Sequence, residues 1–118
     1  GVLDWELSTL GHPLADLAYQ LMAWQFPRES GISGLAGLDR ADLNIPDDER
    51  YIRRYCERTG TAGIDDWNFY MAFCFFRLAS ITQGIRKRAL IGTASSPEAE
   101  AKAAMVEPLS AMGAAYTE

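Results

Sequence analysis

The chain has 118 residues, of which 48% are hydrophobic, and a formal net charge of -5. This length supports one packed core and is too short for two ordinary domains. The acidic balance argues against a nucleic-acid partner, and no apolar run approaches the roughly twenty residues that a membrane-spanning helix needs. The two cysteines, Cys56 and Cys74, have no disulfide or zinc spacing, so we expect a protein of the reducing cytoplasm.

A short buried β segment is expected at the N-terminus. Val2, Leu3 and Trp5 form an apolar run around Asp4, and on an extended chain Glu6 lies on the same side as Asp4. A buried carboxylate here either accepts hydrogen bonds as a structural acid or binds a hard cation such as Mg²⁺, and the spacing alone favours the structural role. The chain begins directly with this apolar run and has no initiator Met. We therefore interpret it as a piece of a longer protein.

A first amphipathic helix is expected over residues 13–25, because apolar residues recur at helical spacing and Pro13 suits the first helical position. His12 is the only histidine, and its place before this proline favours a turn or N-cap role over a catalytic one. Residues 26–45 are rich in glycine and polar side chains and are expected to form a loop.

A second helix is expected to begin near Pro46 and to end at Gly60. Acids at its N-terminal end and arginines towards its C-terminal end both match the helix dipole. Its predicted inward face consists of Tyr51, Ile52 and Tyr55.

The longest predicted helix runs over residues 66–91. Apolar side chains lie nearly all round its first half, which predicts a central, buried helix whose aromatic residues are mostly core. One stripe contains Trp67, Tyr70, Cys74, Leu78, Ile81 and Ile85, and a second contains Phe69, Phe73 and Phe76.

Three polar side chains on this helix need a partner: Arg77, Gln83 and Arg86. A phosphate or CoA group would suit an arginine, but an internal salt bridge is the favoured interpretation. The acids expected to provide it are Asp16, Asp65 and Asp66.

A last helix is expected from the capping-box spacing at residues 95–98 towards Tyr116, kinked or split by Pro108. The predicted fold is therefore mainly α, with one short N-terminal β segment.

The segment GVLDWELSTLGHPLADLAY resembles the segment after the catalytic loop in the aminoglycoside phosphotransferase and choline kinase family. There an Asp-Trp-Glu triplet replaces the Asp-Phe-Gly of protein kinases, and the turn through Gly11 and Pro13 is followed by an acid, here Asp16. The resemblance implies that residues 1–118 form the helical C-terminal lobe of a kinase-like domain. The nucleotide-binding lobe and the catalytic base would lie upstream, so that this piece alone would be inactive.

By this resemblance Asp4 binds the Mg²⁺ ion that bridges the phosphates of ATP. Trp5 and Glu6 support the site within the triplet, and Asp16 supports the catalytic loop without touching substrate. His12 departs from the family, many members of which have Asp there. Weak substrate contacts are assigned to Arg77, Gln83 and Arg86.

A closer resemblance covers nearly the whole chain and is to the kinase-like domain that some animals fuse ahead of an acyl-CoA dehydrogenase. Its blocks include Trp67-Asn68-Phe69, Phe76-Arg77-Leu78-Ala79, Gln83-Gly84 and Pro108-Leu109. It implies a nucleotide and a small-molecule hydroxyl acceptor as partners, with 4-hydroxyacyl-CoA as a candidate acceptor. The alternatives are an aminoglycoside kinase and a helical interaction module without chemistry. Exposed apolar patches on the isolated piece would favour a homodimer or poor solubility.

Overall fold

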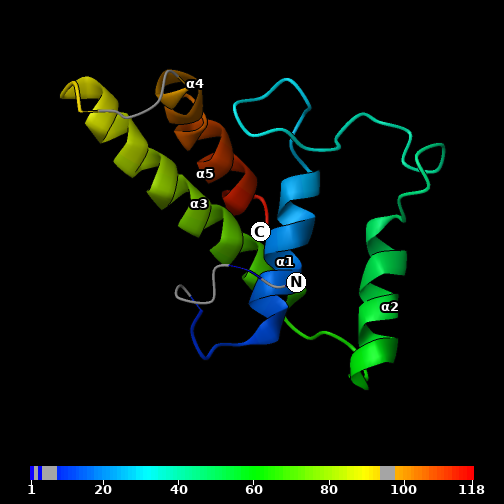
Figure 1. Cartoon of the computed structure of the whole chain (residues 1–118). Helices are drawn as coiled ribbons and strands as arrows, with labels where there is room; N and C mark the ends of the chain where they lie inside the picture. Colours follow the sequence, from blue (N-terminus) through cyan, green and yellow to red (C-terminus); the bar gives the residue numbers. More distant parts are fainter. Residues whose placement is uncertain (2, 4–7, 94–97) are drawn as a thin grey trace.

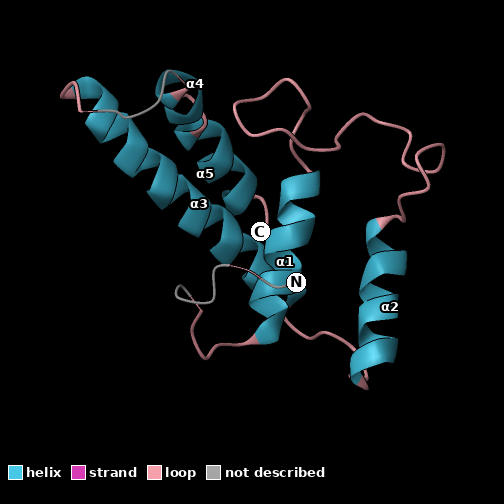
Figure 2. Cartoon of the chain, viewed as in Figure 1, coloured by secondary structure: helices cyan, strands magenta, loops and turns pink. Residues whose placement is uncertain are grey.

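The computed structural model describes residues 1, 3, 8–93 and 98–118, which form five helices and contain no strand (Figures 1 and 2). In chain order the helices are α1 (Pro13–Trp24), α2 (Asp48–Thr59), α3 (Trp67–Leu90), α4 (Ala99–Ala103) and α5 (Val106–Ala114). The mainly helical prediction is confirmed. The predicted β segment around residues 2–7 falls largely outside the described residues.

Helix α1 begins as its sequence predicts, because Pro13 occupies the first turn and His12 caps it. Nδ1 of His12 accepts a hydrogen bond of 3.4 Å from the backbone N–H of Leu14. The helix ends at Trp24, one residue before the predicted end. Its apolar stripe is buried throughout and comprises Leu14, Leu17, Ala18, Leu21 and Met22.

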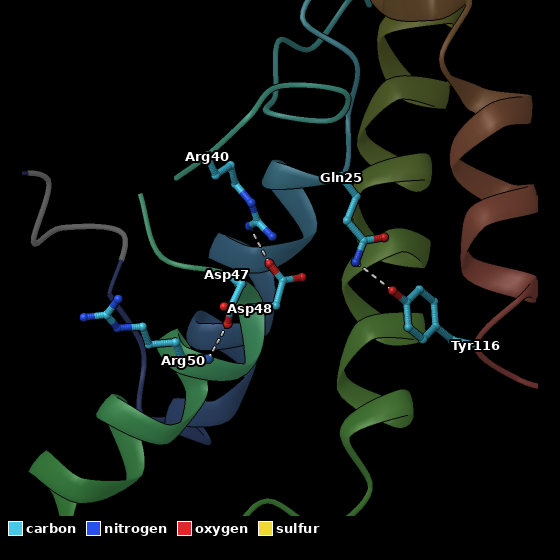
Figure 3. Close-up of polar contacts among 6 residues, drawn as sticks. All are labelled: Gln25, Arg40, Asp47, Asp48, Arg50 and Tyr116. Atoms are coloured by element: carbon cyan, nitrogen blue, oxygen red, sulfur yellow. Dashed lines mark hydrogen bonds and ion pairs between the residues drawn. The ribbon is translucent and has the colours of Figure 1, made fainter. Parts of the chain in front are cut away.

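Helix α3 is the central element, since α1 packs on one side of it and α4 and α5 pack on another (Figure 1). Phe75 lies at the middle of this contact, edge-on to Phe26 and stacked on Tyr116. The hydroxyl of Tyr116 accepts a hydrogen bond of 2.6 Å from Nε2 of Gln25, which joins the end of α1 to the C-terminal segment (Figure 3). The core therefore unites both ends of the chain around α3.

Helix α3 is central as predicted, but one side of its first half is uncovered, so the prediction that this half is buried is wrong there, and the expected exposed apolar patch is present. Phe69, Phe73 and Phe76 are 64%, 42% and 70% exposed, and we call them the exposed aromatic row. Of the first predicted stripe, Cys74 and Leu78 are buried but Ile81 is exposed. Two neighbouring helical layers can cover only part of a helix surface, and none of the described residues packs over the remaining side.

Helix α2 begins at Asp48, two residues after the predicted start at Pro46, ends before Gly60 as predicted, and is less buried than predicted. Asp47 caps its first turn by accepting a hydrogen bond of 2.7 Å from the N–H of Arg50 (Figure 3). Gly60 ends the helix in the left-handed conformation at φ 71°. None of its side chains is fully buried. The predicted inward face of Tyr51, Ile52 and Tyr55 is therefore only half-buried, and α2 stands apart from the other helices (Figure 1).

The last predicted helix is split into α4 and α5, as Pro108 predicts. Proline has no N–H to donate to the carbonyl of the residue four positions earlier, here Ala104, and the break falls at Ala104 and Met105. Helix α5 packs closely on α3, since a Cβ atom at Gly113 would lie 3.0 Å from Cβ of Phe75. The predicted capping box has three of its four residues outside the described part of the chain.

The loop after α1 folds back on the end of that helix. The N–H of Leu35 donates to the carbonyl of Trp24, and the N–H of Ala36 donates to that of Phe26. Gly34 lies so close to this turn that a Cβ atom there would collide with the carbonyl oxygens of Ala23 and Phe26. Separately, no helix of the described residues is long and apolar enough to cross a membrane.

We predict that Gly34→Ala lowers the free energy of unfolding by about 1–3 kcal/mol, because the backbone must shift to admit the methyl group. Gly63→Ala is the matched control, since its Cβ would meet open space at an ordinary φ, and it should change stability by less than about 1 kcal/mol. Urea unfolding followed by circular dichroism measures both. Equal stability of the two variants would contradict the close approach at Gly34.

We also predict that this chain alone associates in solution through the exposed aromatic row, because exposed apolar patches tend to become buried between molecules. Replacing Phe69 and Phe76 by serine should raise the monomer fraction in sedimentation velocity without loss of helix content. Replacing Leu90 and Ile91 by serine is the control, since these side chains are 80% and 64% exposed at the other end of α3. A wild-type chain that stays monomeric at all concentrations would count against the prediction.

Candidate functional site

The predicted metal ligand Asp4 and its neighbours Trp5 and Glu6 lie outside the described residues, so their roles stay predictions. The structure describes the surface that follows them in the chain. A hollow of about 390 Å³ lies between the start of α1 and the first turns of α3. Its lining consists of Thr9, Gly11, His12, Ala15, Asp16, Phe69, Tyr70, Phe73 and Arg77.

His12 anchors the turn that leads into this hollow. Besides capping α1, its Nδ1 lies 3.4 Å from the hydroxyl of Tyr70, and the two rings are 5.3 Å apart. Because Nδ1 accepts from the Leu14 N–H, the ring proton belongs on the other nitrogen. The predicted structural role of His12 is confirmed, and the contact fixes the start of α1 against α3.

Arg77 forms no ion pair with any of the three acids that the sequence suggested, Asp16, Asp65 and Asp66. Asp16 is exposed in the first turn of α1, and no described residue pairs with its carboxylate. The guanidinium of Arg77 instead lies over the ring of Tyr19, 5.3 Å from its centroid. Arg77 is exposed and lines the hollow without an ion-pair partner among the described residues, so it is available to an anion there.

Cys74 lies directly beneath this surface. Its Sγ donates a weak hydrogen bond of 3.4 Å to the carbonyl of Ala15. Burial raises the pKa of the Cys74 thiol, the nearby Arg77 partly offsets this, and the Asp16 carboxylate adds to it. Cys74 is therefore a neutral packing residue, and Cys56 in α2 is also free.

The other two weak substrate candidates lie away from the hollow. Arg86 pairs with Glu107 of α5 at 2.7 Å, and hydrogen bonding to Arg86 lowers the pKa of the exposed Glu107 carboxyl. The expectation of an internal salt bridge is thus correct for Arg86, but the predicted acids are wrong, because α5 covers this end of α3. Gln83 is exposed. Arg86 is nine residues from Arg77, or about 13 Å along the helix, so the three do not form one site.

An apolar groove adjoins the hollow. It has a volume of about 380 Å³ and is lined by the exposed aromatic row together with Ala72, Ala79, Leu109, Ser110, Gly113, Ala114 and Thr117. Phe69 and Phe73 line both spaces, so the hollow that contains Asp16 and Arg77 shares a wall with the apolar groove. Among the described residues, no group of three or more His, Cys, Asp or Glu side chains is arranged to hold a metal ion.

Residues 1–66, more than half of the chain, match the sequence profile of the phosphotransferase enzyme family, and the chain belongs to this family. Acyl-CoA dehydrogenase family member 10 of Mus musculus is 50% identical over 109 residues, which are 92% of this chain and 10% of that protein. Acyl-CoA dehydrogenase family member 11 of Homo sapiens is 40% identical over 113 residues, which are 95% of this chain and 14% of that protein.

A solved structure agrees with the family assignment. The crystal structure of a Ralstonia eutropha protein, provisionally described as an aminoglycoside phosphotransferase, superposes with a TM-score of 0.88 at 50% identity. The match covers 98% of this chain and 35% of that one. The predicted resemblance and the helical, kinase-like fold are confirmed, and this chain spans about a third of the solved relative and a tenth of the first curated relative.

We predict that burial of Cys74 makes stability fall at alkaline pH. The pKa of the Cys74 thiol is raised above the usual 9.0 in the folded protein. Below pH 9.0 the thiol is protonated in both the folded and the unfolded state, so its contribution to the free energy of unfolding is fully present. Above it the unfolded thiol loses its proton while the folded one keeps it, so stability falls by at most about 1.4 kcal/mol per pH unit.

The measurement is the free energy of unfolding between pH 7 and 10.5. Cys74→Ala should remove this part of the decline, even though the smaller side chain lowers stability at every pH. Cys56→Ala should keep it. If wild type and Cys74→Ala decline in parallel, the buried thiol is not responsible.

Proposed function

We propose that the protein containing this chain is an ATP- and Mg²⁺-dependent phosphotransferase that acts on a small-molecule hydroxyl, and that residues 1–118 form the C-terminal part of its catalytic domain. The observation that carries the proposal is the family match over residues 1–66, which includes the Asp-Trp-Glu triplet at 4–6 and the turn from Gly11 to Asp16. A solved relative about three times longer supports the assignment to part of a larger domain.

Asp4 is the proposed Mg²⁺ ligand, and the donor chemistry fits. Mg²⁺ is bound by one or two carboxylates together with phosphate oxygens and water rather than by a complete protein cage. The lack of a three-residue metal cluster in the described ranges is compatible with such a site. When bound, the ion would neutralise charge on the phosphates of ATP. Trp5 and Glu6 would hold the carboxylate of Asp4 in place.

Asp16 is proposed as a positioning residue for the catalytic loop. Its carboxylate is exposed at the hollow, on a helix whose start is fixed by the cap at His12 and the contact with Tyr70. An anchored acid with no ion-pair partner in the described part can accept hydrogen bonds from backbone N–H groups of a neighbouring loop. Arg77, on the facing wall of the same hollow, would contact an anionic group of the substrate.

The exposed aromatic row is proposed to be covered by the rest of the catalytic domain. The solved relative, at 50% identity, contains nearly twice as much further chain as the matched part. Covering Phe69, Phe73 and Phe76 there would bury the apolar area that this chain leaves in water. The hollow beside the row would then become an internal pocket.

For the acceptor we propose 4-hydroxyacyl-CoA. The names of relatives 40–50% identical to this chain support an acyl-CoA context. The description of the solved relative favours an aminoglycoside instead. The described lining of the hollow carries one cation, Arg77, and one carboxylate, Asp16, so its charge does not decide between the two acceptors, and the proposal of an acyl-CoA rests on the relatives.

We predict that Asp4→Asn in the full-length protein lowers kcat for phosphate transfer from Mg-ATP to 4-hydroxyacyl-CoA by at least about a hundred-fold, or roughly 3 kcal/mol. The amide keeps the size of the side chain but loses the charge that holds the cation. Asp65→Asn is the control, an exposed acid outside the hollow, and should leave kcat unchanged.

A panel of aminoglycosides tested in parallel identifies the acceptor. If phosphate is transferred only to an aminoglycoside, the proposed acceptor is wrong but the proposed phosphotransferase activity is correct. If no acceptor is phosphorylated and Asp4→Asn leaves Mg-ATP binding unchanged, a helical interaction module becomes the better description.

A further inference from the structure

We propose that a second hollow, between residues 40–46 and the first turns of α2, binds the phosphate-bearing end of the acyl-CoA acceptor through Arg50 and Arg54. The choice of CoA rests on the proposed function, whereas the anion site rests on the arrangement of α2 itself. The hollow has a volume of about 450 Å³. Its lining consists of Arg40, Ala41, Asn44, Ile45, Pro46, Asp47, Arg50, Tyr51 and Arg54.

The order of charges along α2 separates two faces of the helix. Arg53 has acids one turn away on both sides, Glu49 and Glu57, so its face alternates in sign. Arg54 instead has arginines one turn away on both sides, Arg50 and Arg58. Like charges at this spacing destabilise a helix. An anion bound between Arg50 and Arg54 would remove the repulsion between these two, whereas Arg58 is not part of the lining.

Of the other charged side chains at the hollow, Arg40 is in an ion pair, and Asp47 keeps its negative charge while it caps the helix. Arg40 pairs with Asp48 at 2.6 Å (Figure 3). The carboxylate of Asp47 accepts from the N–H of Arg50, so the helix N-terminus is capped by the protein's own acid. In Figure 3 the guanidinium of Arg50 points away from the Arg40–Asp48 pair. Within the described ranges, neither Arg50 nor Arg54 has an ion-pair partner.

A rigid support lies behind the two arginines. The guanidinium of Arg40 sits 5.3 Å over the ring of Trp24, and the ring of Tyr51 meets Trp24 edge-on at 4.9 Å. Together with the ion pair to Asp48, these contacts attach the first turns of α2 to the end of α1. These contacts fix the backbone from which the two exposed arginines project.

The chemistry of the hollow matches the nucleotide end of CoA. That end carries a diphosphate and a phosphomonoester, and guanidinium groups bind phosphate through paired, charge-assisted hydrogen bonds. Half-buried Ile45, Pro46 and Tyr51 supply apolar surface for a purine ring. The hollow is also of ligand-binding size. The acyl thioester would extend from here towards the catalytic centre.

The experiment uses the full-length protein and two acceptors, a 4-hydroxyacyl-CoA and the same 4-hydroxyacyl group on pantetheine, which lacks the nucleotide end. The double variant Arg50→Gln/Arg54→Gln should raise KM for the acyl-CoA at least about ten-fold, as expected for the loss of a charge-assisted hydrogen bond. KM for acyl-pantetheine and for ATP should not change. Arg53→Gln/Arg58→Gln removes the same charge from the same helix outside the hollow and should leave all three values unchanged.

Binding of CoA alone, measured by calorimetry, separates failure of this site from failure of the proposed function. If the protein phosphorylates neither acceptor but binds CoA, and only Arg50→Gln/Arg54→Gln weakens that binding, the anion site stands without the reaction. Equal effects of the two double variants would overturn the proposal. A raised KM for ATP would also overturn it, because the hollow would then bind the phosphate donor. Unchanged CoA binding in both double variants would overturn it as well.

Discussion

The packing around Phe75 is the interaction on which the rest of the structure depends. This side chain is fully buried and contacts Phe26 from the loop after α1, Tyr116 from the C-terminal segment and Gly113 of α5. Segments that are far apart in the sequence meet on one ring, so α3 can act as the frame for both neighbouring helical layers. The packing of α1 on α3 also determines the shape of the candidate hollow, because Asp16 lies on α1 and Arg77 lies on α3.

Local features of the fold could be predicted from the sequence because their causes are local. The start of α1 follows from Pro13 and the end of α2 from Gly60, whereas α2 begins two residues after Pro46, behind a cap at Asp47. The split before Pro108 follows equally directly from a missing N–H.

Features that depend on what packs against a helix could not be predicted in this way. Aromatic periodicity along α3 identifies an apolar side, but it cannot tell whether that side faces α1, α5 or water, and Phe69 and Phe76 are exposed. The salt-bridge partner of Arg86 was missed for the same reason, since Glu107 comes near only after α5 has folded back. The predicted role of Asp4 came from a resemblance, and the described residues contain only the surface beside it.

The attachment of α2 has a consequence for how specificity can change within such a domain. Because no side chain of α2 is fully buried, its surface residues contribute little to the stability of the core, and most substitutions there cost little. The helix is nevertheless fixed in place at one end by Trp24 and Arg40. A protein built in this way can acquire preference for a different ligand by altering α2 while the frame around Phe75 stays intact, which separates evolution of substrate choice from maintenance of the fold.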